Sequence, residues 1–301
     1  MIKGADFGDC LTKWTPEYLI EKLNDTPVKI HHSNEPILNF LKKNFTYKTI
    51  QFNELINKCI SNDGNEYFYL RALGTDKRGR EIANLKKHFK SIGDDIEIPS
   101  FINLAKESDE SLEDDEVQDE HQLFSSVLRI SSPNLVLWTH YDILDNILLQ
   151  ICGTKSVTLF SPEDVPYLYL EGDKSKVHDI DASIEELKIE FPLFLKATRY
   201  QCELHSGDAL FIPSLWFHNV KANDFSISVN FFWKDKQLIK QDFYDKRDVY
   251  GNKDLVHGAN ALLNLDKIIK NLNKLPIKFR KFYMKVMVER LNNQITQLNQ
   301  K

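Results

Sequence analysis

The chain has 301 residues, 42% hydrophobic content and a formal net charge of −5, which fits one large domain or a domain with an appendage. Its four cysteines are far apart and include no CxxC pair, which argues against a disulfide framework or a zinc ribbon. No apolar run is long enough to span a bilayer and no signal peptide opens the chain, so we expect a cytoplasmic protein, with the nucleus as a second compartment.

Residues 1–100 have the pattern of mixed short helices and strands. Apolar side chains at helical spacing predict helices over residues 16–23 and 52–60, and an aromatic run predicts a strand over residues 66–70. Residues 107–120 then include nine acidic side chains among fourteen and no Lys or Arg. We interpret this stretch as a disordered, solvated loop insertion, with a regulatory segment as the alternative.

A β-rich core follows the acidic stretch. Short apolar runs separated by turn residues predict strands over residues 126–130, 135–138, 146–152, 156–160, 209–212 and 226–233. Short strands joined by tight turns favour a barrel or a sandwich.

From about residue 260 the pattern becomes helical, with one apolar stripe before Pro276 and a second one after it. The stripes have two interpretations, which are packing against the barrel and a dimer interface. Residues 261–301 carry nine Lys and Arg against two acidic residues. Without the acidic stretch the chain has a formal charge of +4, so a polyanionic partner is a reasonable hypothesis.

Two segments combine into a candidate metal site. In the first, His140 and Asp142 are two residues apart beside a predicted strand, so both side chains can point to the barrel interior. In the second, His218 lies just beyond the predicted strand at residues 209–212. Two imidazoles and one carboxylate bind one face of Fe(II) and leave the other face open for a co-substrate and dioxygen.

The His-x-Asp tripeptide alone is a weak signal, because nine His and many Asp make a chance occurrence common. A histidine beside Trp216 and Phe217 is more often a packed core residue than a ligand. Here both halves occur in the right order, and each lies beside a predicted strand. A structural zinc site would instead need a closed set of four ligands.

Four polar residues around this triad suit a 2-oxoacid dicarboxylate. Lys155 starts the strand after a Gly-Thr turn and can pair with a distal carboxylate, and Asn146 offers an amide to the carboxylate that chelates iron. Asn230 is polar within an apolar strand, and Tyr69 offers a phenol. The ordinary alternatives are a surface lysine, an amide near a turn and a buttressing tyrosine.

At these residues the chain resembles the JmjC-type Fe(II)- and 2-oxoglutarate-dependent oxygenases. The resemblance rests on residues 139–142, 146–155, 160–162 and 207–218. Within that superfamily the chain resembles the tRNA hydroxylases of wybutosine synthesis. This narrower match covers about residues 6–290 and rests most on residues 167–170 and 250–254, which lie outside the general JmjC motifs.

The resemblance implies a double-stranded β-helix, a JmjC/cupin-like jelly roll with flanking N-terminal helices and a C-terminal helical segment. It implies an oxygenase domain over residues 1–250 and a helical segment for dimerisation and RNA contact over residues 251–301. The implied iron ligands are His140, Asp142 and His218. The implied 2-oxoglutarate contacts are Tyr69, Asn146, Lys155 and Asn230.

The implied reaction hydroxylates the 7-(3-amino-3-carboxypropyl)wyosine side chain in phenylalanine tRNA, by hydrogen abstraction and delivery of a hydroxyl group. A homodimer is implied, and no membrane partner. The basic C-terminal helices would hold tRNA phosphates, together with these residues of the N-terminal half: Arg71, Lys77, Arg78, Arg80, Lys86 and Lys87. A solvated charged face is the alternative for all of these cations.

Two departures from that family are expected, namely the acidic insertion at residues 107–120 and a missing start of the N-terminal region. Two other functions also remain open. The first keeps the chemistry and changes the substrate, as in a JmjC protein hydroxylase or lysine demethylase. The second is a non-enzymatic, RNA-binding cupin scaffold, which an intact triad with Lys155 and Asn146 argues against.

Overall fold

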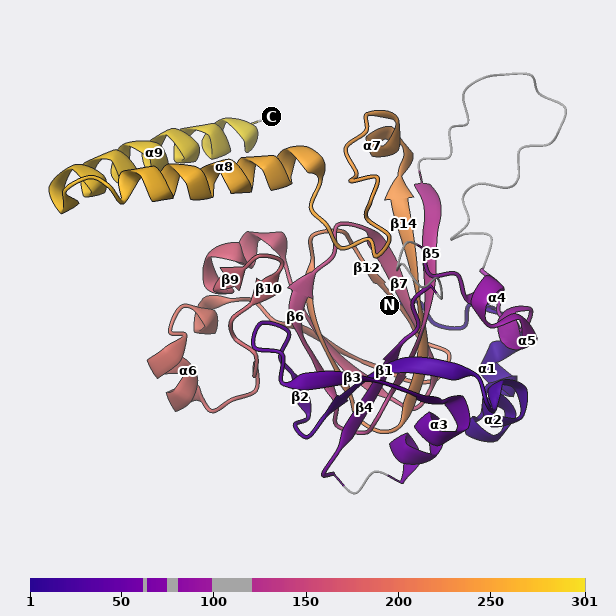
Figure 1. Ribbon diagram of the computed structural model, residues 1–301. Coiled ribbons are helices and arrows are strands. Elements are labelled where there is room, and N and C mark those ends of the chain that lie inside the picture. Colours follow the sequence, from indigo (N-terminus) through magenta and orange to yellow (C-terminus); the bar gives the residue numbers. More distant parts are fainter. Residues whose placement is uncertain (62–63, 75–80, 99–120, 301) are drawn as a thin grey trace, which may run out of the picture. The chain divides into compact units, whose positions relative to one another are not determined.

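A computed structural model describes residues 1–61, 64–74, 81–98 and 121–300 (Figure 1). The chain divides into two compact units. The first comprises residues 1–242 and 246–253, and the second comprises residues 243–245 and 254–301. The acidic stretch at residues 107–120 and the basic residues Lys77, Arg78 and Arg80 lie outside the described ranges.

Two β-sheets form the first unit. One sheet has the strand order β12-β7-β14-β5-β4-β1-β3, and every neighbouring pair is antiparallel. Its strands are β12 (Ala209–Ile212), β7 (Asp145–Cys152), β14 (Ser226–Asp235), β5 (His121–Ser131), β4 (Tyr67–Arg71), β1 (Pro27–Ser33) and β3 (Phe45–Gln51).

The second sheet has the order β11-β8-β13-β6-β10-β9, and β2 pairs in parallel with β6. Its strands are β11 (Tyr200–Leu204), β8 (Lys155–Phe160), β13 (Phe217–Ala222), β6 (Val136–Tyr141), β10 (Lys174–Ser175), β9 (Leu170–Glu171) and β2 (Ile37–Leu38). The two sheets form a cupin-like jelly roll, which confirms the predicted double-stranded β-helix.

An apolar cluster fills the space between the sheets. Tyr69 and Leu148 contribute to it from the first sheet, and Leu137, Val157 and Val220 from the second. Burial of these side chains from both sheets stabilises the closed jelly roll. The strands that carry the cluster also carry the candidate site, so the core fixes the positions of the site residues.

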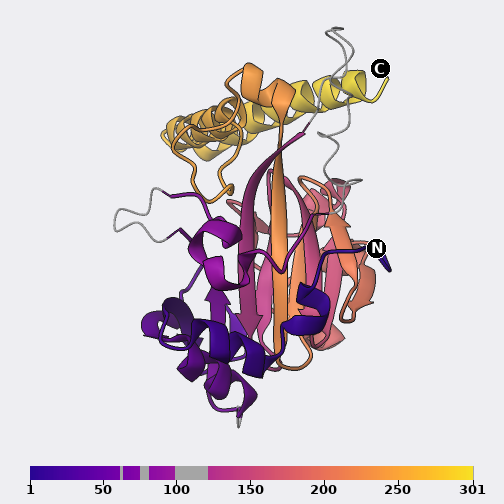
Figure 2. The same ribbon diagram turned by 90° about the vertical axis from the view of Figure 1, so that its right-hand side faces the viewer.

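The N-terminal helices cover the outer face of the first sheet (Figures 1 and 2). These helices are α1 (Cys10–Lys13), α2 (Pro16–Leu23), α3 (Phe52–Ile60), α4 (Leu85–His88) and α5 (Lys90–Gly93). The α2 helix begins as its sequence predicts, because the Thr15 side chain accepts a hydrogen bond from the Tyr18 backbone N–H and Pro16 occupies the first turn. The second large core cluster joins these helices to β5, β7 and β14.

Short helical segments complete the first unit. A 3₁₀ helix at Pro162–Tyr167, α6 (Ile184–Glu190) and a 3₁₀ turn at Phe194–Lys196 surround a third apolar cluster that includes Phe160 and Phe217. The α7 helix (Lys236–Lys240) follows β14. The helices predicted at residues 16–23 and 52–60 are confirmed, and the strand predicted at residues 66–70 lies at Tyr67–Arg71.

The second unit is a helical hairpin of α8 (Val256–Leu272) and α9 (Ile277–Leu298), joined through Pro276 (Figure 1). The helical pattern predicted from residue 260 is confirmed, and it begins slightly earlier than predicted. No residue of α9 is buried, although Leu291, Ile295 and Leu298 are apolar. None of the helices in the described ranges combines the length and the apolar character that a membrane span needs.

Candidate active site

Two neighbouring strands bring the metal-site residues together. In the antiparallel pair of β6 and β13, His140 lies directly opposite His218. Asp142 follows the last residue of β6 and lies in the adjoining loop, where its carbonyl oxygen accepts a hydrogen bond of 2.8 Å from the Leu215 backbone N–H. This bond ties the loop after β6 to the segment before β13, so all three side chains meet at one end of the paired strands.

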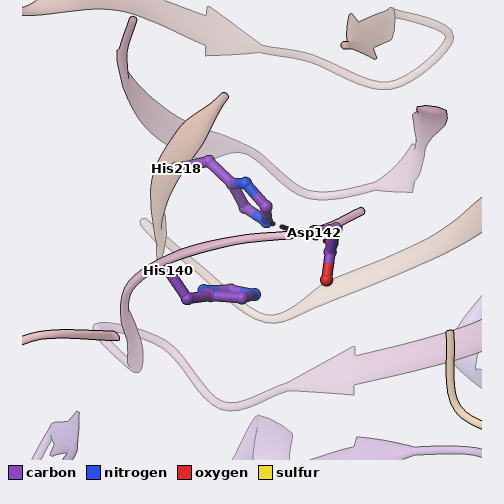
Figure 3. A group of neighbouring side chains, drawn as sticks. All are labelled: His140, Asp142 and His218. Carbon is purple, nitrogen blue, oxygen red and sulfur yellow. Dashed lines mark ion pairs between the residues drawn. The ribbon is translucent and has the colours of Figure 1, made fainter. Parts of the chain in front are cut away.

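The three side chains form a compact group (Figure 3). One ligand atom from each of His140, Asp142 and His218 lies within 4.8 Å of the others. The His218 Nε2 atom is 3.6 Å from Asp142 Oδ2, and the two imidazole ring centroids are 4.2 Å apart. Such a group can close around a single metal ion with little rearrangement of the backbone.

The hydrogen bonds of the two imidazoles determine their tautomers. His140 Nδ1 is 2.9 Å from the Trp138 carbonyl oxygen, and His218 Nδ1 is 3.2 Å from the Trp216 carbonyl oxygen. A carbonyl oxygen can only accept, so both Nδ1 atoms carry the proton and both Nε2 atoms keep their lone pairs. Backbone orientation of this kind is typical of metal-binding histidines.

Burial keeps both imidazoles neutral. It lowers the pKa of His140 to about 3, and the neighbouring His218 acts in the same direction. Burial also lowers the pKa of His218. Two neutral imidazoles and one carboxylate match the donor set of a non-haem Fe(II) site, and within the described ranges the group has three members. The triad is therefore consistent with Fe(II), with room for further ligands.

Lys155 lies in the interior as the first residue of β8. Its side chain donates a hydrogen bond to Ser228 Oγ on β14, and the residue is 3% exposed. Burial lowers the pKa of Lys155 to about 7, and Arg129 adds to the effect. No carboxylate in the described part of the chain pairs with this ammonium group. Since an unpaired buried charge is costly, the position suits an anionic ligand.

A buried amide pair joins β7 and β14. Asn146 Oδ1 accepts a hydrogen bond of 3.0 Å from Asn230 Nδ2, while Asn146 Nδ2 is buried without a hydrogen-bond partner. Tyr69, on β4, is 2% exposed, and its hydroxyl accepts a hydrogen bond from Arg129. An orphaned amide donor and an unpaired ammonium fit the two carboxylates of 2-oxoglutarate.

Residues 1–238 match a family model described as a cupin-like domain. The chain belongs to this family. It is 43% identical to the tRNA wybutosine-synthesizing protein 5 of Mus musculus over 300 residues, which span 97% of this chain and 88% of the mouse protein. The identity to the protein of the same name from Homo sapiens is 42% over 295 residues, or 96% of this chain and 86% of the human protein.

A more distant relative has a different overall length. The chain is 32% identical to the tRNA wybutosine-synthesizing protein 4 of Gibberella zeae over 296 residues, which are 97% of this cupin and 26% of the fungal protein. The resemblance to wybutosine-synthesising proteins that the sequence motifs indicate is thus confirmed over nearly the full chain.

The structure changes two details of the sequence interpretation of this cupin. His218 lies within a strand of its own, β13, and not in a segment just beyond the strand at residues 209–212. Asp142 reaches the site from the loop after β6, and not from within the strand. The assignments of His140, Asp142 and His218 to iron, and of Tyr69, Asn146, Lys155 and Asn230 to 2-oxoglutarate, stay predictions.

Two site residues receive no role from the sequence motifs. Ser228 is the hydrogen-bond partner of Lys155, and Arg129 is that of Tyr69. A signal exists for Ser228, because it lies two residues from Asn230 in a strand whose first eight residues are all buried. Polar side chains with this spacing in such a strand point to the same face and need partners there.

Proposed function

We propose that this chain is an Fe(II)- and 2-oxoglutarate-dependent hydroxylase of the wybutosine-precursor side chain in phenylalanine tRNA. The observation that carries the proposal is the triad of His140, Asp142 and His218, in a chain aligned almost end to end with proteins named for tRNA wybutosine synthesis. The unpaired Lys155 and the orphaned Asn146 amide support 2-oxoglutarate as the co-substrate.

In the proposed site, His140 and His218 offer their Nε2 lone pairs to iron, and Asp142 offers its carboxylate. When bound, Fe(II) would use dioxygen to convert a C–H bond of the substrate into C–OH, while 2-oxoglutarate takes the second oxygen atom and leaves as succinate and carbon dioxide. The backbone carbonyls of Trp138 and Trp216 hold the two imidazoles in the binding tautomer. This fixed orientation places the reactive centre before the substrate arrives.

The remaining residues position the co-substrate. Lys155 would pair with the distal carboxylate, while the Nδ2 atom of Asn146 would donate to the carboxylate beside the metal. Asn230 holds the Asn146 amide through its own hydrogen bond and forms part of the polar wall. Tyr69 would add a phenol donor to the same anion. The apolar cluster between the sheets limits water at the site, which strengthens each of these charged contacts.

We also propose two roles for the helical segment at residues 251–301, with residues 1–250 as the oxygenase domain. The exposed apolar side chains of α9 support a homodimer, because a folded helix rarely leaves such a stripe in water. The clustered Lys and Arg residues of the same helices support contact with tRNA phosphates. A tRNA substrate in turn supports a cytoplasmic location.

The test is nucleoside mass spectrometry on phenylalanine tRNA that carries the 7-(3-amino-3-carboxypropyl)wyosine precursor. The tRNA is incubated with the full chain, Fe(II), ascorbate and 2-oxoglutarate, in parallel with a His218→Ala variant. We expect a nucleoside one oxygen heavier, which disappears in the variant and without 2-oxoglutarate. An unchanged nucleoside would refute the tRNA proposal. If succinate still forms in that case, the enzyme is an oxygenase with another substrate, such as a protein side chain.

A further inference from the structure

Two arginines face each other beside the triad. Arg71, the last residue of β4, lies directly opposite Arg129 of β5 in the antiparallel register. Like charges in this position repel each other across the strands. Neither side chain extends freely into solvent, since the Nε atom of each is buried and has no hydrogen-bond partner.

Of the described acidic side chains, Asp142 offsets part of this repulsion electrostatically. Arg129 donates a hydrogen bond to the Tyr69 hydroxyl, and within the described residues neither guanidinium group forms an ion pair. Burial and the charge of Arg129 lower the pKa of Arg71, although an arginine stays protonated at any physiological pH. Two fixed positive charges with buried, unsatisfied donors are costly, and an anion that binds between them would relieve the cost.

The pair lies close to the reactive centre. Arg129 lies directly opposite Ser228 of β14, and the Ser228 hydroxyl accepts the hydrogen bond of Lys155. The charge of Arg129 also acts on His140 and His218, and the Asp142 carboxylate acts on Arg71. The pair therefore lies beside the proposed co-substrate residues and within electrostatic range of the triad.

The loop after α7 belongs to the same neighbourhood. The Asp248 carboxylate accepts hydrogen bonds from the backbone N–H groups of Tyr250, Gly251 and Lys253, at 3.1, 3.0 and 2.9 Å. This turn holds Tyr250 within electrostatic reach of Arg71. Tyr250 belongs to the sequence motif at residues 250–254, which has no role in the metal site.

The arginine pair is not needed to balance the charges of the proposed co-substrate site. With iron and 2-oxoglutarate bound, the positive charges of Fe(II) and protonated Lys155 balance the negative charges of Asp142 and the two co-substrate carboxylates. Among the described residues, Arg71 and Arg129 then have no ion-pair partner. A further anion, brought by the substrate itself, can neutralise them.

We propose that Arg71 and Arg129 bind the carboxylate of the amino acid group on the substrate's side chain. This inference rests on the proposed function, in which the reacting side chain carries one carboxylate. A guanidinium group binds a carboxylate through two parallel hydrogen bonds, which would orient that side chain as well as attract it. A tRNA phosphate offers the same anionic chemistry. The carboxylate fits better, because it is only a few bonds from the carbon that reacts.

The test compares two tRNAs under anaerobic conditions, with Fe(II) and 2-oxoglutarate present so that binding is measured without reaction. One is phenylalanine tRNA with the free side-chain carboxylate, and the other carries its methyl ester. We expect the wild-type protein to bind the acid about tenfold to a hundredfold more tightly than the ester. In Arg71→Gln this preference should vanish, and in Arg71→Lys it should persist in part, because the charge remains but the planar fork is lost.

A Lys48→Gln variant is the matched control, since it removes one exposed positive charge of β3 from the same unit. It should keep the full preference for the acid. Equal loss of both tRNAs in Arg71→Gln would overturn the proposal in favour of a phosphate contact. Weaker 2-oxoglutarate binding in Arg71→Gln, or a wild type without preference, would overturn it too. The mass spectrometry above tests the proposed function separately, because binding preference and product formation are independent readouts.

Discussion

Lys155 is a site residue whose charge changes near neutral pH. Burial lowers its pKa to about 7, so in the free protein the ammonium loses its proton as the pH rises through about 7. A bound dicarboxylate favours the charged form and raises the pKa of this lysine again. Above pH 7, binding must therefore take up a proton, whereas below pH 7 the proton is already present.

The affinity for 2-oxoglutarate should consequently fall as the pH rises from 7 to 9, by up to about tenfold per pH unit. The imidazoles do not interfere in this range, because the pKa of His140 is about 3 and that of His218 is also lowered. Anaerobic calorimetry of the iron-loaded protein in a pH series measures the effect. A Lys155→Met variant should bind weakly and without this slope. A flat wild-type profile would contradict a protonated Lys155 as the carboxylate partner.

At the scale of elements, the turn between β7 and β8 sets the position of Lys155. Gly153 has a φ of +75°, and a Cβ atom there would approach the Phe225 carbonyl oxygen to 2.0 Å. The Asp224 carboxylate accepts hydrogen bonds from the Thr154 backbone N–H at 2.7 Å and from the Thr154 hydroxyl at 3.0 Å. Only glycine fits this close approach.

Gly153→Ala should therefore lower the free energy of unfolding by more than about 2 kcal/mol, because backbone strain and a steric clash add together. Gly172→Ala is the matched control. Gly172 has a φ of +62°, and a Cβ atom there meets nothing within 4 Å, so only the strain of about 1–2 kcal/mol applies. Urea denaturation of both variants measures the difference. Equal destabilisation would show that the contact with Phe225 has no energetic weight.

The same elements show which parts of the fold the sequence predicts. Strands such as β7 and β12 are short, apolar and bounded by turns, and they are predicted nearly as observed. The strand β13 is not predicted, because two of its five buried residues are the polar His218 and Asn219. Polar residues that serve the site interrupt the apolar pattern by which a strand is recognised.

Site residues that are close in sequence can be predicted from a local pattern, whereas residues brought together by strand pairing cannot. The spacing of His140 and Asp142 is visible in a tripeptide, and the order of the two segments adds His218. The pairing of Arg71 with Arg129 depends on the register of β4 against β5. Register is set by tertiary packing along the whole strand, so no local pattern in this chain indicates it.

At the scale of the whole molecule, the apolar side chains of α9 predict association between two copies. Leu291 is 57% exposed and Ile295 is 55% exposed, so the helix presents a stripe that water solvates poorly. The double substitution Leu291→Glu with Ile295→Glu places two charges in this stripe. We expect it to shift the protein from dimer to monomer, because burying unpaired carboxylates in an interface is costly.

Sedimentation velocity at several protein concentrations measures the shift. A control variant, Asn293→Glu with Gln297→Glu, adds the same charges to the opposite side of α9 and should remain dimeric. A wild-type chain that is monomeric throughout would contradict the homodimer. Loss of the dimer in both variants would show that charge, and not the apolar stripe, governs the association.

The distribution of charge over the molecule predicts how tRNA binding depends on salt. Lys278, Lys281 and Lys285 lie on α9, in the basic second unit. If each contacts a phosphate, replacing all three with Gln should reduce the slope of log affinity against log salt by about 2, since each neutralised phosphate contributes roughly 0.7–0.9. Titrations of labelled phenylalanine tRNA at salt concentrations of roughly 50 to 200 mM measure this slope.

The matched control removes three exposed lysines from the first unit, and these are Lys188, Lys196 and Lys221. Both triple variants lose the same net charge, so a general attraction to RNA would change both slopes equally. A smaller slope in the α9 variant alone would instead mean that phosphates lie against the helical hairpin. Hydroxylation should then show the same division, because a tRNA held by its backbone reaches the iron site only if the contacts that position it are intact. An unchanged slope in the α9 variant would remove the helices from the tRNA-binding surface.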